Sequence, residues 1–253
     1  MRSRQQDNFL QGYLKGAAMC AVVKSDSLGQ CKEGFSRMND KFFDLTKEKQ
    51  DRMINAALKV FAKYGYGHAS TDDIVREAAI SKGLLFHYFE SKLGTYAFVY
   101  QYSVRYVILE LGTAGIGKKE TGKKDIFTIA RQLEQARWQI LKGYPYLLGF
   151  LKKAEGEEVS EALAETESMK EKLRETVEKI KDSIDPEGLP AGTDVNRLFS
   201  VLQFTMDGLM KEQFDRGAFQ PDMLHEEVLA YISMLEQAYM VPKEQELQEE
   251  QES

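Results

Sequence analysis

The stretch from residue 70 to residue 92 constrains the fold more than any other, because it has the pattern of two short amphipathic helices joined by a tight turn. The hydroxyl of Ser70 is placed to cap the first helix, and that of Ser81 is placed to cap the second. The pattern therefore predicts a helix-turn-helix, whose second helix is of the kind that enters the DNA major groove. Apolar residues recur at helical spacing on the facing sides of the two helices: Ile74, Val75 and Ala78, then Leu85, Tyr88 and Phe89.

The outward face of the second helix indicates which partner such a motif would bind. Lys82 and Gly83 open the helix, where backbone N–H groups and the helix dipole attract phosphate and a glycine lets a sugar-phosphate backbone approach closely. Phe86, His87 and Tyr88 follow, and this mixture of apolar and polar groups suits thymine methyls, base edges and phosphates. These residues favour DNA as the partner. The alternative is that the helix pair is an ordinary part of a helical bundle.

The run from Thr71 to Lys92, with Ser-Lys-Gly-x-Leu-Phe-His-Tyr-Phe-x-Ser-Lys at its centre, resembles the N-terminal domain of the TetR/AcrR family of bacterial transcriptional regulators. The resemblance is specific over residues 46 to 100. It implies DNA contacts at the start of the first helix of the motif, along the recognition helix and at the lysine that opens the next helix. In this sequence the matching positions are Ser70, Thr71, Lys82, Gly83, Leu84, Phe86, His87, Tyr88 and Lys92.

Four residues depart from the family pattern. Leu84 stands where a small hydroxyl residue is common, and Phe86 stands where tyrosine is usual. Leu93-Gly94 replaces the usual acidic start of the next helix, which predicts a helix that is less well begun. The operator preference of relatives therefore does not carry over to this chain.

The negative charge of the chain is concentrated in its C-terminal part. The formal net charge of −6 divides into +2 for residues 1 to 40, +2 for residues 41 to 112 and −10 for residues 113 to 253. This division fits a near-neutral to basic DNA-binding region attached to an acidic body. Bulk charge of this size gives little affinity for DNA, so a specific operator would be required.

Residues 1 to 40 differ in pattern from the rest and are predicted to be a disordered leader or extension. The apolar run from Gly16 to Val23 follows a polar stretch and precedes no small-residue cleavage pattern, so a signal peptide is not expected. Met38 is an alternative natural start. Cys20 and Cys31, the two cysteines of the chain, both fall in this segment, which is consistent with a reducing cytoplasm. No stretch approaches the about 18 apolar residues that a membrane-spanning helix needs.

The remaining sequence predicts an all-α protein with two domains. Residues 41 to 92 form a three-helix DNA-binding domain, whose support helix runs from Thr46 to Tyr64, places Ile54, Ala57, Leu58, Phe61 and Tyr64 inward, and ends at Gly65 and Gly67. Residues 93 to 241 form a helical effector-binding and dimerisation domain, and residues 242 to 253 form an acidic tail. A fourth helix is expected at 91–111, a glycine-rich mobile loop at 112–124, and further helices at 125–141, 146–153, 157–183, 194–216 and 221–239.

Two features of the C-terminal domain predict its partners. The last two helices carry more apolar residues than an internal core requires, which favours pairing with a second copy, as the resemblance also implies; the alternative is that both stripes are internal. Aromatic and methionine side chains of the kind that line an apolar effector pocket are Tyr96, Tyr100, Trp138, Tyr144, Phe150, Phe204 and Met206, with Phe199 and Met210 beside them. An effector bound there would have to favour one spacing of the DNA-binding domains, with coupling through the fourth helix.

The sequence thus predicts a cytoplasmic homodimeric transcription factor that vacates a palindromic double-stranded DNA operator when a small, partly apolar effector binds. Catalysis has little support, since His68, His87 and His225 are scattered and no metal-binding or nucleophile motif is present, so no cofactor or metal is expected. Two alternatives stay open: an activator with the same DNA-binding domain, and a helical ligand-binding or enzymatic protein that no longer binds DNA. The operator, the effector and the regulated genes cannot be deduced from the sequence.

Overall fold

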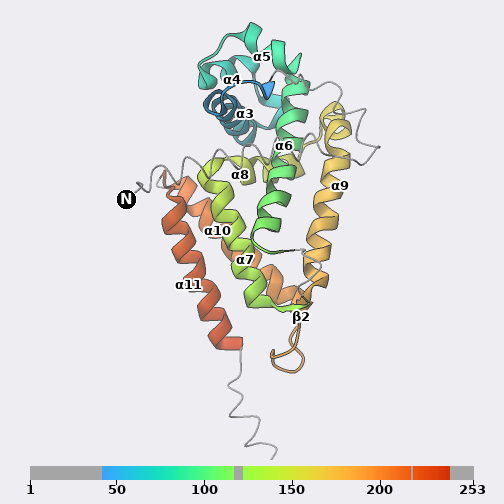
Figure 1. Cartoon of the computed structure of the whole chain (residues 1–253), viewed down its shortest axis with the longest axis vertical. Coiled ribbons are helices and arrows are strands. Elements are labelled where there is room, and N and C mark those ends of the chain that lie inside the picture. Colours follow the sequence, from blue (N-terminus) through green and yellow to red (C-terminus); the bar gives the residue numbers. More distant parts are fainter. Residues whose placement is uncertain (1–41, 117–121, 218, 240–253) are drawn as a thin grey trace, which may run out of the picture. The chain divides into compact units, whose positions relative to one another are not determined.

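The computed structural model describes residues 42–116, 122–217 and 219–239, and these form nine α-helices and one short strand pairing (Figure 1). The predicted all-α class is confirmed. The predictions for residues 1–40 and for the acidic tail lie outside the described residues. The chain divides into two compact units, which we call the first unit (residues up to Leu109, with Tyr144–Glu171) and the second unit (Glu110–Gly143, with the residues from Lys172 on).

The first unit contains the helix-turn-helix and more. Its elements are α3 (Lys47–His68), α4 (Thr71–Ala78), α5 (Lys82–Phe89), α6 (Lys92–Thr113) as far as Leu109, α8 (Leu147–Glu155), and α9 (Ser160–Asp182) as far as Glu171. The predicted support helix, helix pair and fourth helix correspond to α3, α4, α5 and α6. The compact unit extends beyond the predicted domain boundary at residue 92, because α3 packs along α8.

The core of the first unit forms where the stripe of α3 meets α4, α5 and α8. Ile54, Leu58 and Phe61 are buried, as predicted. Tyr64 is 39% exposed, so its predicted inward position is wrong. The buried side of α3 continues from Phe61 to Gly65 and Tyr66 instead, and α3 leaves the helical conformation at Gly65, whose φ is +69°. Ala57 of α3 is also buried, and the buried residues that close this core from the other helices are Ile74, Ala78, Leu85, Phe89 and Phe150.

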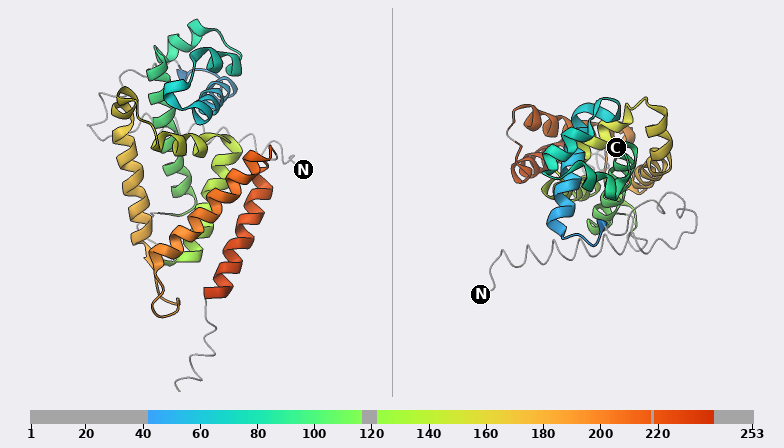
Figure 2. Two further views of the ribbon diagram at one scale, coloured as in Figure 1. Left: turned by 180° about the vertical axis from the view of Figure 1, so that it is seen from behind. Right: turned by 90° about the horizontal axis from the view of Figure 1, so that it is seen from above.

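The second unit is built around α7 (Ile126–Gly143). Helix α10 (Val195–Asp215) and helix α11 (Pro221–Tyr239) form an antiparallel pair, and α11 also packs along α7 (Figure 2). Strands β1 (Lys124–Asp125) and β2 (Ile184–Asp185) pair in parallel, with Lys124 opposite Ile184. This pairing was not predicted, and it joins the start of α7 to the end of α9.

The last two helices have an inner face and an outer face, as predicted from their many apolar residues. Leu198, Leu202 and Leu209 of α10 are buried, and so are Leu224, Val228 and Ile232 of α11. Large apolar side chains remain exposed on the opposite faces: Val201 and Phe204 of α10, and Met223, Tyr231 and Met234 of α11. These exposed side chains contradict the alternative in which the apolar stripes of α10 and α11 are both entirely internal.

Candidate nucleic-acid interface

The turn between α4 and α5 is fixed by the caps that the sequence predicts. The hydroxyl of Ser70 accepts a hydrogen bond from the backbone N–H of Asp72 (3.1 Å), and that of Ser81 accepts one from the N–H of Leu84 (3.1 Å). Between the caps, Ala79 adopts the left-handed conformation with φ +51°. The N–H of the following residue then bonds to the carbonyl of Val75 (3.0 Å), which ends α4 sharply. The local sequence therefore folds as a helix-turn-helix.

Helix α5 divides into a buried face and an exposed face. Its buried residues are Leu85, Tyr88 and Phe89, and its exposed residues are Lys82, Gly83, Leu84 and His87, with Phe86 half-buried. Tyr88 was predicted to contact DNA, but it is only 8% exposed and its ring packs 5.7 Å from that of Phe42. Its spacing from Leu85 explains this, because residues three apart lie on the same side of a helix. This burial confirms the inward position predicted from the helical spacing of Leu85, Tyr88 and Phe89, whereas the DNA contact of Tyr88 stays a prediction.

Two acidic residues lie close to the basic groups of this surface. Lys82 pairs with Asp72 of α4 at 2.9 Å between Nζ and Oδ1, and Arg76 pairs with Asp73 on α4 itself. Both partners of the Lys82 pair are about half exposed or more, so the pair is weak and exchangeable. A phosphate could replace Asp72 as the partner of Lys82 at little cost.

Lys92 opens α6 and has partners within the protein. Its Nζ donates to the carbonyl oxygens of Tyr66 (3.0 Å) and Ala69 (3.4 Å), and it lies 4.3 Å from the centre of the Tyr66 ring. A lysine ammonium has three donors, and these bonds use two of them at the corner between α3 and α4. Lys92 therefore stabilises the corner that positions α4, a role that its place in the sequence did not indicate.

Tyr66 links the same corner to the start of α9. Its backbone N–H donates to Glu157 Oε2 (2.8 Å), and its hydroxyl donates to Glu161. Burial, followed by the bond to Glu161, raises the pKa of the Tyr66 hydroxyl, so this group stays protonated and remains a donor. The sequence did not indicate a role for Tyr66, Glu157 or Glu161. No local signal could have revealed it, because Tyr66 and its partners are separated by about ninety positions.

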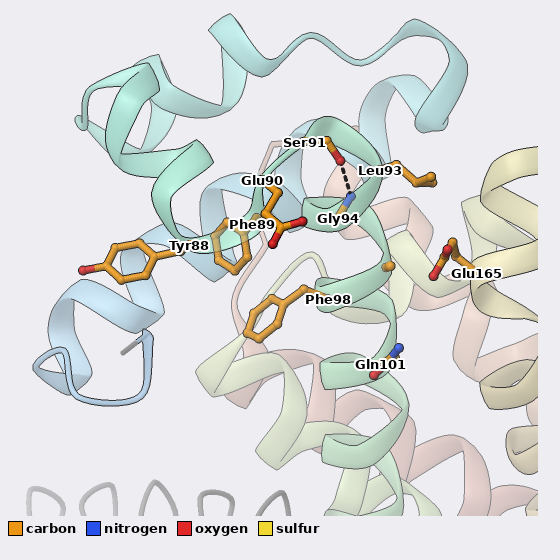
Figure 3. A pocket seen from close by; sticks show the side chains of 10 residues that line it. Tyr88, Phe89, Glu90, Ser91, Leu93, Gly94, Phe98, Gln101 and Glu165 are labelled. Atoms are coloured by element: carbon orange, nitrogen blue, oxygen red, sulfur yellow. Dashed lines mark hydrogen bonds between the residues drawn. The ribbon is translucent and has the colours of Figure 1, made fainter. Parts of the chain in front are cut away.

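The turn between α5 and α6 explains the departure at Leu93-Gly94. Glu90 has φ +62°, and a Cβ atom on Gly94 would lie 2.0 Å from the carbonyl oxygen of Phe89, so only glycine fits. Ser91 caps α6 by accepting from the N–H of Gly94 at 2.9 Å (Figure 3). This helix was expected to have a weaker N-terminus without an acidic residue. That expectation is wrong, because the hydroxyl of Ser91 caps the N-terminus of α6.

A small pocket opens beside this turn. It is lined by residues of α5 and α6 and by Glu165 of α9, as Figure 3 shows. Its volume of about 80 Å³ is well below the roughly 300 Å³ at which sites for drug-sized ligands begin. None of the seven predicted effector-pocket residues lines it. This pocket is therefore not the predicted effector site.

Four of the predicted effector-pocket residues lie in the first unit. The ring of Phe150 packs edge-on against Tyr96 (5.5 Å) and Tyr100 (6.0 Å). Tyr144 is buried elsewhere in the unit, where its hydroxyl bonds to Tyr102 at 2.6 Å and accepts from Lys47 Nζ at 2.8 Å. The structure thus brings three of the four into one aromatic cluster.

The other three predicted pocket residues lie in the second unit. Met206 is buried on α10, whereas Phe204 is 74% exposed. Phe204 does not line an enclosed cavity in this chain, because it is on the outer face of α10. Trp138 stacks on His225 with 4.8 Å between ring centres, and its Nε1–H donates to Asp222 (2.7 Å). Through these two contacts Trp138 joins α7 to α11.

The described residues contain no group of three or more His, Cys, Asp or Glu side chains arranged to bind a metal ion. Among the described helices, none combines the length and the apolar character that crossing a bilayer requires.

The capped turn, the core face and the exposed face of α5 together define a helix-turn-helix DNA-binding domain, carried on a helical chain. Residues 53–94 match the sequence model of a family described as bacterial regulatory proteins, tetR family. The chain therefore has the N-terminal domain and the fold of TetR-family transcriptional regulators, which are not enzymes. The resemblance predicted from the sequence is confirmed.

Two relatives illustrate how far the similarity reaches. A stretch of 46 residues is 48% identical to an uncharacterized HTH-type transcriptional regulator, YuxN of Bacillus subtilis (strain 168), and covers 18% of this chain and 16% of that protein. The crystal structure of a TetR family transcriptional regulator, PfmR from Thermus thermophilus, is similar with a TM-score of 0.50 and 19% identity, covering 72% of this chain and 96% of that one. The family model thus matches residues 53–94, this relative matches over a short stretch, and the structural similarity concerns the fold.

Proposed function

We propose that this protein is a DNA-binding transcriptional regulator that acts as a homodimer and represses until a small effector releases it from its operator. The observation that carries the proposal is the exposed face of α5, where Lys82, Gly83, Leu84 and His87 lie together at the surface of a capped helix-turn-helix. A recognition helix presents such residues to the major groove, while neighbouring helix N-termini and lysines bind phosphates.

The homodimer is supported by the outer faces of α10 and α11. Val201 and Phe204 lie three residues apart on α10, and Met223, Tyr231 and Met234 recur along α11. Single exposed apolar residues are ordinary, but five of them on two adjacent helices favour a surface of the kind that partners bury. A second copy of the chain offers the matching surface under two-fold symmetry.

The effector site is proposed for the aromatic clusters of the helical chain, in particular Tyr96, Tyr100 and Phe150. Burial raises the pKa of Tyr100 to about 12, so its hydroxyl remains a neutral donor at physiological pH. Neutral hydroxyls among aromatic rings suit a ligand that is mostly apolar with a few polar groups. The cytoplasm is the proposed location, as for other regulators that bind chromosomal DNA.

A gel-shift assay with the intergenic DNA upstream of the protein's own gene tests the proposal. The complex should persist in excess competitor DNA and weaken as salt is raised, because specific binding exceeds non-specific binding by orders of magnitude. Adding candidate lipophilic compounds should release the DNA. Repression and activation are distinguished by a reporter gene placed under control of the operator. When the gene of this protein is deleted, reporter expression rises if the protein is a repressor and falls if it is an activator.

A second candidate is a helical ligand-binding protein that no longer binds DNA. It is favoured by the internal partners of Lys92 and by the pairing of Lys82 with Asp72, which reduce the positive charge available to phosphates. This candidate predicts that no sequence is bound more tightly than competitor DNA, even at low salt. The same gel-shift series therefore decides between the two.

A further inference from the structure

Leu84 is an aliphatic side chain that the fold leaves at the surface of α5. It is 38% exposed, and its neighbour Leu85 fills the core instead. Isolated exposed leucines are common, so the exposure alone indicates little. The position is more informative, because Leu84 is in the first turn of α5 and one helical turn from the exposed His87. The N-terminal residues of a recognition helix are those that reach base edges.

The surroundings of Leu84 leave room for a partner. A Cβ atom built on Gly83 would meet nothing within 4 Å, so the surface beside Leu84 is open. The backbone N–H of Leu84 already bonds to the Ser81 hydroxyl (3.1 Å), which fixes the backbone and leaves only the side chain to meet the partner. Lys82 turns to Asp72 on α4, so its charge does not cover the leucine.

The chemistry of the side chain restricts what it can recognise. A leucine neither donates nor accepts hydrogen bonds, so it cannot read the donor and acceptor pattern of a base pair, and a phosphate buried against it would lose its hydration without gaining a partner. In the major groove the apolar feature is the C5-methyl group of thymine. Resting on the function proposed above, we propose that Leu84 selects thymine in the operator by contact with this methyl group.

The test compares thymine with uracil, which lacks only the methyl group. In-vitro selection with the full-length chain, from a random duplex library, first defines a bound sequence. Each thymine of that duplex is then replaced by uracil in turn, and the affinities of the wild type, Leu84→Ala and Leu84→Met are measured. Alanine is a good helix former and Leu84 is exposed, so Leu84→Ala should keep the fold, which thermal unfolding checks.

One thymine in each half-site should show a coupled effect. Its replacement by uracil should weaken wild-type binding about fourfold, which corresponds to about 0.8 kcal/mol for one methyl group. The same replacement should leave the affinity of Leu84→Ala unchanged and should still weaken Leu84→Met, which keeps an apolar side chain. If a sequence is selected but every uracil substitution affects the wild type and Leu84→Ala equally, the thymine contact is refuted and DNA binding stands. If no sequence is enriched, the proposed function fails as well.

Discussion

Gly83→Ala is the substitution that best separates DNA binding from folding. Gly83 is in the first turn of α5, and a Cβ atom there would meet no atom within 4 Å. Gly83 is also absent from the described residues with positive φ, so alanine fits its backbone without strain. Replacing glycine by alanine inside a helix stabilises it by roughly 0.5–1 kcal/mol. The variant should therefore unfold about 1–4 °C above the wild type.

The effect on DNA binding should have the opposite sign. If the sugar-phosphate backbone packs against Gly83, the added methyl group must displace it, and overpacking of one methyl-sized group costs about 1–3 kcal/mol. The affinity for operator DNA should then fall about fivefold or more. The measurement is a pair of experiments on the same preparation, namely thermal unfolding and titration of labelled operator at fixed salt.

The unfolding temperature and the operator affinity of Gly83→Ala together test whether DNA approaches Gly83. A stabilised variant that binds the operator as tightly as the wild type would show that DNA does not approach Gly83, and the assignment of α5 as the recognition helix would lose its main support. A destabilised variant would instead contradict the open surroundings of Gly83. The matched control is Gly112→Ala, another glycine with nothing within 4 Å of an added Cβ, which lies outside the helix-turn-helix and should leave affinity unchanged.

Three further substitutions test the charges and the dimer surface. Lys92→Ala should lower the unfolding free energy by about 1–2 kcal/mol, because two charge-assisted bonds at the α3–α4 corner are lost, and should weaken binding to all sequences; a urea midpoint equal to the wild type would exclude the structural role. Asp72→Asn should raise DNA affinity up to about fivefold by releasing Lys82, as read from a salt-titrated gel shift, and unchanged affinity would place Lys82 away from phosphates. Phe204→Glu should yield a folded monomer in sedimentation analysis, since Phe204 is 74% exposed in the single chain; an intact dimer would rule out the outer face of α10 as the interface.

The parts of the fold that follow from local sequence could be predicted. The hydroxyls of Ser70 and Ser81 cap the helices for which they were predicted, and the α11 helix begins at Pro221 and ends at Tyr239 as expected. Caps, glycine positions and apolar periodicity act within one or two helical turns, so the sequence records them directly. The same holds for the buried face of α5, where Leu85, Tyr88 and Phe89 lie inward as their spacing predicts.

Residue type alone did not reveal which way an aromatic side chain faces. Phe204 was assigned to a ligand pocket, yet it is exposed on the outer face of α10. Tyr88 was assigned both to the core, by its spacing, and to the DNA surface, and its ring is in the core beside Phe42. An aromatic ring is equally suited to a core, a ligand pocket or an interface. Only the position of the neighbouring helices separates these roles, and the sequence does not record that position.

Contacts between distant segments also escaped prediction. Tyr66 meets Glu157 and Glu161, and Lys92 returns to the carbonyl of Tyr66. Each of these residues has an ordinary polar or aromatic side chain whose partner depends on the packing of α8 and α9 against the helix-turn-helix. The two-residue pairing of β1 with β2 is another such contact, because neither strand is long enough to show a period.

These distant contacts change how binding data on this protein should be read. Lys92 lies at a position where DNA contact is expected and also stabilises the α3–α4 corner, so a loss of binding on its substitution does not identify a phosphate contact. Tyr66 has the same ambiguity, since a substitution there removes the hydroxyl bond to Glu161 and the ring beneath Lys92 without removing any contact to DNA. Gly83 and Leu84 are different, because both lie at the surface and neither packs in the core. Any affinity that depends on these two residues therefore reports on the DNA surface itself, provided that unfolding is measured alongside.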